Sequence, residues 1–109
     1  MEDEEEQQGV IVHLQLSDNR FGTDDDRKVI WALEEEIETA LAEAAAGELD
    51  GDEFGQGECV LFLYGSNADH LFSVIEPLLK SSPIASHGFA IKQYGDISDL
   101  ELKTARVTW

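Results

Sequence analysis

The sequence has very little cysteine and no long apolar segment. Cys59 is the only cysteine among 109 residues, so a disulfide within the chain is excluded. This usage fits a reducing compartment, and we expect a cytoplasmic protein. No basic start is followed by an apolar stretch, and no apolar run approaches the ~18 residues of a membrane span, so we expect neither a secretory signal nor a membrane segment. The length is that of one domain that can fold without disulfides or metal.

Basic residues are also scarce, and the acidic excess is unevenly distributed. The chain has 7 Lys and Arg against 24 Asp and Glu, which gives a formal net charge of −17. Residues 1–58 contain 3 basic and 19 acidic residues, whereas residues 59–109 contain 4 and 5. So negative a surface repels nucleic acid and anionic lipid and attracts basic proteins and divalent cations. Solubility alone is the simplest explanation of this charge, and a basic protein partner is the functional one.

The chain is organised around residues 50–65, which read DGDEFGQGECVLFLYG. Six consecutive apolar residues, 59–64, are typical of a central strand covered on both faces. The glycines on either side of Gln56 predict a tight reversal between this strand and an acidic outer arm, residues 48–54. Because the outer arm has a weak strand propensity, we expect it to be a short edge strand whose charges discourage aggregation.

The residues before this hairpin predict a tail, a strand and a helix. Residues 1–8, MEDEEEQQ, have nothing apolar to bury, and we expect a disordered acidic tail. Residues 10–16 alternate between apolar and mixed positions, as a half-buried strand does. Thr23, followed by three aspartates, is a good N-cap for a helix that we expect to run to about Ala46 and stop at Gly47. The apolar residues that recur at helical spacing along it are Ile30, Leu33, Ile37, Ala40, Leu41 and Ala44.

The residues after the hairpin complete a recognisable order. Residues 68–82 predict a second amphipathic helix that contains Pro77, and residues 88–94 and 100–109 predict two more strands. The order β-α-β-β-α-β with an extra C-terminal β matches a ferredoxin-like split βαβ sandwich, in which two helices cover one face of an antiparallel sheet. We therefore expect a single α+β domain over residues 9–109. An open α+β sheet with another strand order is the alternative.

The segment DGDEFGQGECVLFLYG, with VIVHLQLSDNRFGT before it and IEPLLKSSP after it, resembles a set of small uncharacterised bacterial proteins with a DGDEFGxGECVLFLYG-like segment. The resemblance covers about residues 9–95. These proteins have no established activity, so the resemblance implies a single bacterial cytoplasmic domain and assigns no site residue.

Titratable residues show no metal-binding pattern. The three histidines are far apart in the sequence, and no H-x-x-x-H or E-x-x-H spacing supports a zinc or di-iron site. The hairpin offers oxygen ligands for Ca²⁺ or Mg²⁺ at Asp50, Asp52, Glu53 and Glu58. Their spacing is not that of an EF-hand, so a solvated acidic hairpin is the simpler interpretation and a cation there is the alternative. We expect no metal and no cofactor.

A catalytic pair of Cys59 and His13 would require their two strands to be neighbours. However, Cys59 shares a strand face with Leu61 and Leu63, which predicts a small buried hydrophobe rather than a nucleophile. We therefore expect no catalytic residue.

One face of the sheet is predicted to lie without helix cover. The residues expected there are Ile11, His13, Val60, Phe62, Tyr64, Ala90, Lys92 and Tyr94. An apolar patch of this kind marks a dimer or partner surface, unless the tail or the last strand covers it. Its aromatic residues are placed as in RNA-binding modules that stack bases, but the acidic charge argues against nucleic acid.

Two functions remain in competition. The first is a non-catalytic binding or regulatory module that presents carboxylates to a basic protein, as immunity or inhibitor proteins do, with Phe54 or Trp31 as an apolar anchor. Its expected contact residues are Glu34, Glu35, Glu38, Asp50, Asp52 and Glu53. The alternative is a small-ligand sensor or an enzyme that uses the open sheet face. A homodimer through that face or through an edge strand is compatible with either.

Overall fold

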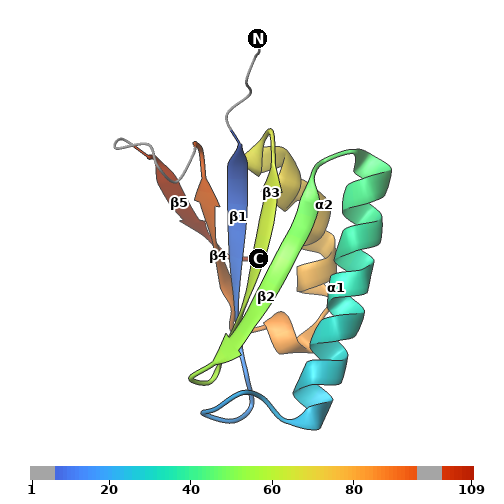
Figure 1. Ribbon diagram of the computed structural model, residues 1–109, viewed down its shortest axis with the longest axis vertical. Helices are drawn as coiled ribbons and strands as arrows, with labels where there is room; N and C mark the ends of the chain where they lie inside the picture. Colours follow the sequence, from blue (N-terminus) through green and yellow to red (C-terminus); the bar gives the residue numbers. More distant parts are fainter. Residues whose placement is uncertain (1–6, 96–101) are drawn as a thin grey trace.

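The computed structural model describes residues 7–95 and 102–109, which form one antiparallel sheet with two α-helices on one face (Figure 1). The strands are β1 (Gln8–Gln15), β2 (Glu48–Gly55), β3 (Glu58–Gly65), β4 (Phe89–Gln93) and β5 (Thr104–Val107). The helices are α1 (Asp24–Ala44) and α2 (Ala68–Lys80), and a 3₁₀ turn, η1 (Pro83–Ala85), follows α2. This element order is the predicted one.

The order of the strands across the sheet is β2-β3-β1-β4-β5, and every neighbouring pair is antiparallel. β1 therefore lies at the centre, and β2 and β5 form the two edges. The predicted α+β class, with two helices over an antiparallel sheet, is confirmed. The strand order is compatible with a ferredoxin-like arrangement extended by one strand.

The core lies between the sheet and the helices. Alternate residues of β1 and β3 point toward the helices and are fully buried, namely Val10, Val12, Leu14, Cys59, Leu61 and Leu63. The predicted stripe of α1 packs on them through Ile30, Leu33, Ile37 and Leu41, all buried. The prediction that residues 59–64 are covered on both faces is wrong, because the helices cover only one side of the sheet and burial in β3 alternates.

The beginning of α1 follows the sequence prediction, but its end does not. The Thr23 hydroxyl accepts a hydrogen bond from the Asp26 backbone N–H at 3.1 Å, and the Asp26 carboxylate accepts one from the Thr23 N–H at 3.2 Å, which completes a capping box. The helix ends at Ala44, and Ala45, with φ of 51°, adopts the left-handed conformation expected for Gly47. Glycine is required at position 47 for another reason, because the backbone there passes close to the end of β3 and leaves no room for a Cβ atom.

Two other predicted boundaries are placed by the structure. Gln8 is the first residue of β1, and its side-chain oxygen accepts a hydrogen bond from the Ala68 N–H at 2.7 Å, at the beginning of α2. Gln8 thus belongs to the fold rather than to the predicted tail, whose residues 1–6 lie outside the described residues. The predicted reversal in the hairpin is confirmed as a two-residue turn, with φ of 55° at Gln56 and 80° at Gly57.

The end of the chain is held by Trp109, which lies two residues after β5. The Trp109 indole N–H donates a hydrogen bond to the Ala85 carbonyl at 2.8 Å, and its ring centroid lies 6.4 Å from that of Phe72. Trp109 therefore anchors the end of the chain between η1 and α2, on the helix side of the sheet.

Candidate functional site

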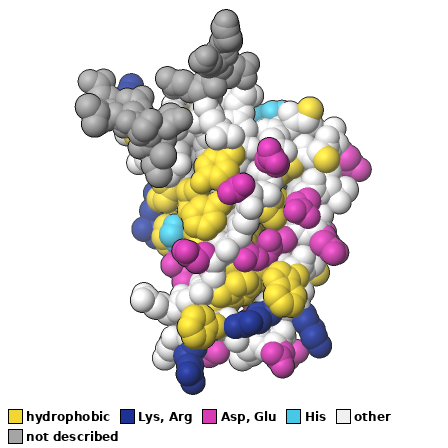
Figure 2. Space-filling view, viewed as in Figure 1, with side chains coloured by type: hydrophobic (Ala, Val, Ile, Leu, Met, Phe, Trp, Pro, Cys, Tyr) yellow, Lys and Arg dark blue, Asp and Glu magenta, His cyan; other side chains and the backbone are white. Residues whose placement is uncertain are grey.

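The two acidic elements singled out from the sequence are neighbours in space, because α1 lies alongside the edge strand β2 (Figure 1). Asp52 is the register partner of Leu61, whose side chain is buried beneath the helices, so Asp52 faces the helix side of the sheet. Glu34 follows the buried Leu33 on α1, and its carboxyl group meets that of Asp52. Acidic side chains gather over this part of the molecule (Figure 2).

Glu34 is in an unfavourable position for a carboxylate. Desolvation by burial, followed by the hydrogen bond and the charge of Asp52 and the charge of Glu38, raises the pKa of Glu34 from its ordinary value of 4.5 to about 8. Among the described residues, its Oε2 atom is buried and has no hydrogen-bond partner. The cluster therefore lacks a hydrogen-bond donor and a positive charge at this point, and either would stabilise it.

The raised pKa of Glu34 makes stability depend on pH. Since the pKa is higher in the folded than in the unfolded state, its contribution favours folding at low pH and is lost as pH rises from about 4.5 through about 8. Glu34→Gln keeps the shape and the neutral state at every pH. We expect the melting temperature of Glu34→Gln to exceed that of the wild type by a margin that is small near pH 5 and grows through pH 8, as measured by thermal melts across this range.

The matched control for this titration is Glu35→Gln, which removes an exposed carboxylate one position further along α1. The difference in melting temperature between Glu35→Gln and the wild type is expected to be the same at pH 5 and at pH 8. Parallel pH profiles for all three proteins would contradict the raised pKa of Glu34.

The other predicted contact residues are divided between two sides of the molecule. Glu35 and Glu38 are exposed on α1, and Asp50 is exposed at an irregularity of β2 between Leu49 and Gly51. Glu53, however, is the register partner of Val60, which places it on the opposite, helix-free side of the sheet. The acidic face is defined here as Glu34, Glu35, Glu38, Asp50 and Asp52, and Glu53 is not part of it.

Aromatic residues lie at one end of the acidic face. Trp31 is 52% exposed on α1, one turn before Glu34 and Glu35. The Arg27 guanidinium lies 5.5 Å from the ring centroid of Phe54, and its Nε donates a hydrogen bond to the Phe21 carbonyl at 3.1 Å. Phe54 and Trp31 are the two candidate anchors named from the sequence, whereas the contact of Arg27 with Phe54 was missed because it depends on how β2 packs against α1.

The helix-free side of the sheet carries part of the predicted residue set. His13, Phe62 and Tyr64 lie there as predicted. The prediction is wrong for Ala90, Lys92 and Tyr94: Ala90 and Lys92 pair with the core residues Val12 and Val10, so they face the helices. The residues of β4 that do lie on the helix-free side are Phe89, Ile91 and Gln93.

Lys92 and Tyr94 bind α2 instead. The Lys92 ammonium and the Tyr94 hydroxyl donate hydrogen bonds to the same carboxylate oxygen of Asp69, at 2.9 Å and 2.7 Å. The hydrogen bond from Lys92, and then that from Tyr94, hold the pKa of Asp69 below its ordinary value. The group therefore joins β4 to the first turn of α2.

A row of side chains crosses the helix-free side from β3 to β5. The His13 Nδ1 atom lies 3.0 Å from the Glu58 Oε2 atom, and the imidazole stacks on Phe89 with centroids 4.5 Å apart. The Arg106 Cζ atom lies 3.9 Å from the centroid of Phe89. A cleft of about 320 Å³ opens beside His13 and is also lined by Gln56.

Cys59 does not take part in this row. It is the register partner of Leu14 and is fully buried on the helix side, whereas His13 pairs with Val60 and faces the other way. Burial, and then the charges of Asp52 and Glu34, raise the pKa of the Cys59 thiol to about 12. The predicted role of Cys59 as a buried hydrophobe is confirmed, and the geometry does not allow a Cys59–His13 pair.

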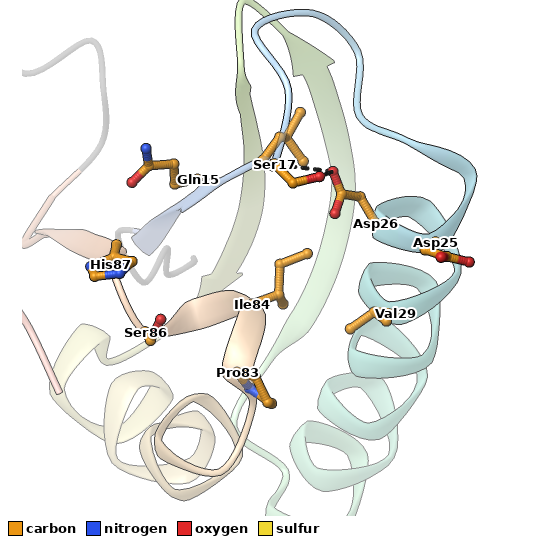
Figure 3. A pocket seen from close by; sticks show the side chains of 10 residues that line it. Gln15, Ser17, Asp25, Asp26, Val29, Pro83, Ile84, Ser86 and His87 are labelled. Atoms are coloured by element: carbon orange, nitrogen blue, oxygen red, sulfur yellow. Dashed lines mark hydrogen bonds between the residues drawn. The ribbon is translucent and has the colours of Figure 1, made fainter.

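A second cleft, of about 620 Å³, lies between the end of β1, the beginning of α1 and η1 (Figure 3). Val29 and Ile84 reach into it, whereas Asp25 points away. Desolvation opposes ionisation of Asp26 at its rim, but hydrogen bonds from Ser17 and Thr23 outweigh it and lower the pKa of Asp26. Because these bonds occupy the carboxylate in the helix cap, it is structural rather than catalytic.

Searches with the sequence match no protein-family model, no curated protein and no solved structure. Within residues 7–95 and 102–109, no three His, Cys, Asp or Glu side chains gather as a metal site would require. No helix in that part of the chain has both the length and the apolar character needed to cross a membrane. The function is therefore inferred from the protein's own surface.

Proposed function

We propose that the protein is a non-catalytic binding or regulatory module that engages a basic protein through its acidic face, in the manner of immunity or inhibitor proteins. One observation carries the proposal: Glu34 is held against Asp52 with a buried carboxyl oxygen that no described residue satisfies. A Lys or Arg side chain of a partner that pairs with the exposed Asp52 would bring a positive charge beside this oxygen. Residues with shifted pKa values in such surroundings are candidates for functional sites.

The surroundings of Glu34 suit a protein partner. Glu35 and Glu38 are exposed on α1 beside it, and their charges would speed the encounter with a positive surface. Trp31, half exposed at the end of the acidic face, is the type of residue that dominates binding energy when an interface buries it. Electrostatic steering and an aromatic anchor therefore lie side by side on α1.

We further propose that the scaffold is a ferredoxin-like split βαβ sandwich extended by β5, and that it works in the bacterial cytoplasm. The strand order β2-β3-β1-β4, with both helices on one face, supports the first part. The single cysteine, held as a buried thiol, supports a reducing compartment.

The salt dependence of association tests the acidic face. A partner is first isolated by pull-down, and its association rate is then measured from about 0.05 to about 0.5 M salt, where the Debye length falls from ~14 to ~4 Å. We expect the rate to fall roughly tenfold or more over this range. The triple variant Glu34→Gln, Glu35→Gln, Glu38→Gln is expected to associate more slowly and to respond less to salt.

The matched control replaces the same number of carboxyl groups elsewhere. Glu36 and Glu43 are two and nine residues after Glu34, so helical geometry places them on the opposite side of α1 from Glu34 and β2. Glu76 lies on α2 beside Lys80. The triple variant Glu36→Gln, Glu43→Gln, Glu76→Gln should retain most of the association rate. Association that is independent of salt and equal for both triple variants would rule out the acidic face as the binding site.

One observation favours the alternative function, a small-ligand sensor or enzyme on the helix-free side of the sheet. The His13–Glu58 pair borders the cleft of about 320 Å³, so an oriented imidazole is available to a polar ligand there. A metabolite that raises the melting temperature of the wild type, but not that of His13→Ala, would support this function over the first.

A further inference from the structure

The helix-free side of the sheet is a broad surface of apolar and aromatic side chains, which we call the open face. It comprises Ile11, His13, Val60, Phe62, Tyr64, Phe89, Ile91, Gln93 and Arg106 together with Glu48, Glu53 and Glu58. Its apolar side chains lie side by side across β1, β3 and β4, and Figure 2 shows hydrophobic side chains gathered over these strands. Contiguous apolar surface of this kind marks an interface.

The charge of the open face changes sign from one edge of the sheet to the other. β2 contributes Glu48 and Glu53 at one edge, and β3 contributes Glu58. At the other edge, β5 contributes Arg106, which rests on the ring of Phe89. The described residues of β1 and β4 bring no carboxylate and no Lys or Arg to this face. The open face is therefore negative at β2 and β3, uncharged at β1 and β4 and positive at β5.

We propose that two copies of the chain pack open face to open face, about a twofold axis parallel to β1, so that Arg106 of each copy meets Glu53 of the other. β1 is the middle strand of five, so this axis carries β5 of one copy over β2 of the other. A twofold axis across the strands would instead place Arg106 on Arg106 and Glu53 on Glu53. Like charges in contact oppose that arrangement, so the charge pattern selects the first axis.

The register brings the two charges to nearly the same level along the strands. The row of paired residues that runs from β5 to β2 at the level of Arg106 is Arg106, Ile91, Ile11, Phe62 and Gly51. Glu53 lies two residues from Gly51 on the same side of β2, a separation of roughly 7 Å along the strand. A long arginine side chain can span such an offset across the interface.

The size of the face sets the expected strength of the dimer. Three strands of eight residues, one of five and one of four, about 4.8 Å apart and with ~3.3 Å per residue, give a face of roughly 520 Å² per copy. That is about 1,000 Å² in total, below the range of standard specific interfaces and typical of weak complexes. Each copy also carries a net charge of −17, about a third of which lies on α1, on the far side of the sheet. We therefore expect a weak dimer, with a dissociation constant in the micromolar range or above.

Charge reversal tests both the dimer and its axis. The full chain is examined by sedimentation equilibrium from about 5 to about 500 μM at about 0.15 M salt, close to the physiological ionic strength at which screening is moderate. We expect the wild type to show a monomer–dimer equilibrium. Arg106→Glu and Glu53→Arg are each expected to weaken the dimer at least tenfold, and the double variant, with both charges exchanged, is expected to recover most of the wild-type affinity.

The controls make the same charge changes away from the open face. Arg20→Glu changes an exposed residue of the loop before α1, and Glu43→Arg changes an exposed residue of α1. Neither should alter dimerisation by more than about threefold, because surface charges beyond a Debye length are largely screened. A wild type that stays monomeric over the whole concentration range would overturn the proposal. The open face would then be a surface for a ligand or for another protein. A double variant that fails to recover the affinity lost in the single variants would overturn the axis, and equal effects in the controls would overturn the contact.

The open face lies on the opposite side of the sheet from the acidic face. A monomeric wild type would therefore leave the proposed binding of a basic protein untouched. Likewise, loss of that binding function would leave the proposed dimer untouched.

Discussion

Replacing Leu61 by alanine is expected to lower the free energy of unfolding by about 2–5 kcal/mol. Leu61 is fully buried in β3, and its register partners are Val12 on β1 and Asp52 on β2. The loss combines the transfer free energy of the removed methyl groups with the cavity that remains, because the sheet on one side and α1 on the other limit how far the site can collapse. Denaturant melts of the two proteins give the difference directly.

Val60→Ala is the control for this substitution, since it shortens a neighbouring side chain on the other face of the same strand. Val60 is only partly buried and faces the open side, so its loss is expected to be about 1 kcal/mol or less. If Leu61→Ala shifted the free energy of unfolding by no more than Val60→Ala, the helix-covered face would not be the main core of the protein.

The core of this protein could be predicted from its sequence because only one face of β1 is apolar at every position. Val10, Val12 and Leu14 share one parity, opposite His13, and the structure buries all three. In β4 both parities are apolar, with Phe89 and Ile91 on one and Ala90 on the other. Periodicity cannot choose between such faces, and only pairing with β1 shows that the small Ala90 is the one that fits beneath the helices.

The sequence predicts which helix and strand form the candidate site, but not which side chains meet there. The charge asymmetry identified α1 and β2 as the acidic elements, and the structure places them together. Which carboxylates meet depends on the register of β2, which shifts between Leu49 and Gly51, so that Asp52 rather than Glu53 faces the helices. No local sequence pattern encodes that shift, and the pairing of Glu34 with Asp52 follows from it.

The role of Arg106 could not be predicted from the sequence either, for a different reason. It lies on a four-residue edge strand whose partner, β4, is more than ten residues away in the sequence. Its stacking on Phe89 depends on a non-local strand pairing, and the charge gradient across the open face can be recognised only when that pairing is known.

Gly47→Ala is expected to be as damaging as the loss of a core side chain, although it adds only one methyl group. Gly47 has φ of 149°, which non-glycine residues rarely adopt, and a Cβ atom there would collide with the Tyr64 carbonyl oxygen and approach Leu71 Cδ2 to 2.9 Å. Strained backbone and overpacking each cost about 1–3 kcal/mol, so we expect a total loss of about 2–6 kcal/mol in the free energy of unfolding.

Gly51→Ala is the matched control for this substitution, because Gly51 lies on the following strand, β2, and a Cβ atom there meets nothing within 4 Å. Its effect is expected to stay within about 0.5 kcal/mol, since it adds a methyl group in open space on an edge strand. Both variants are compared with the wild type in denaturant melts under the same conditions. Equal stability of Gly47→Ala and Gly51→Ala would show that the connection from α1 to β2 does not pass as close to the end of β3 as the structure places it.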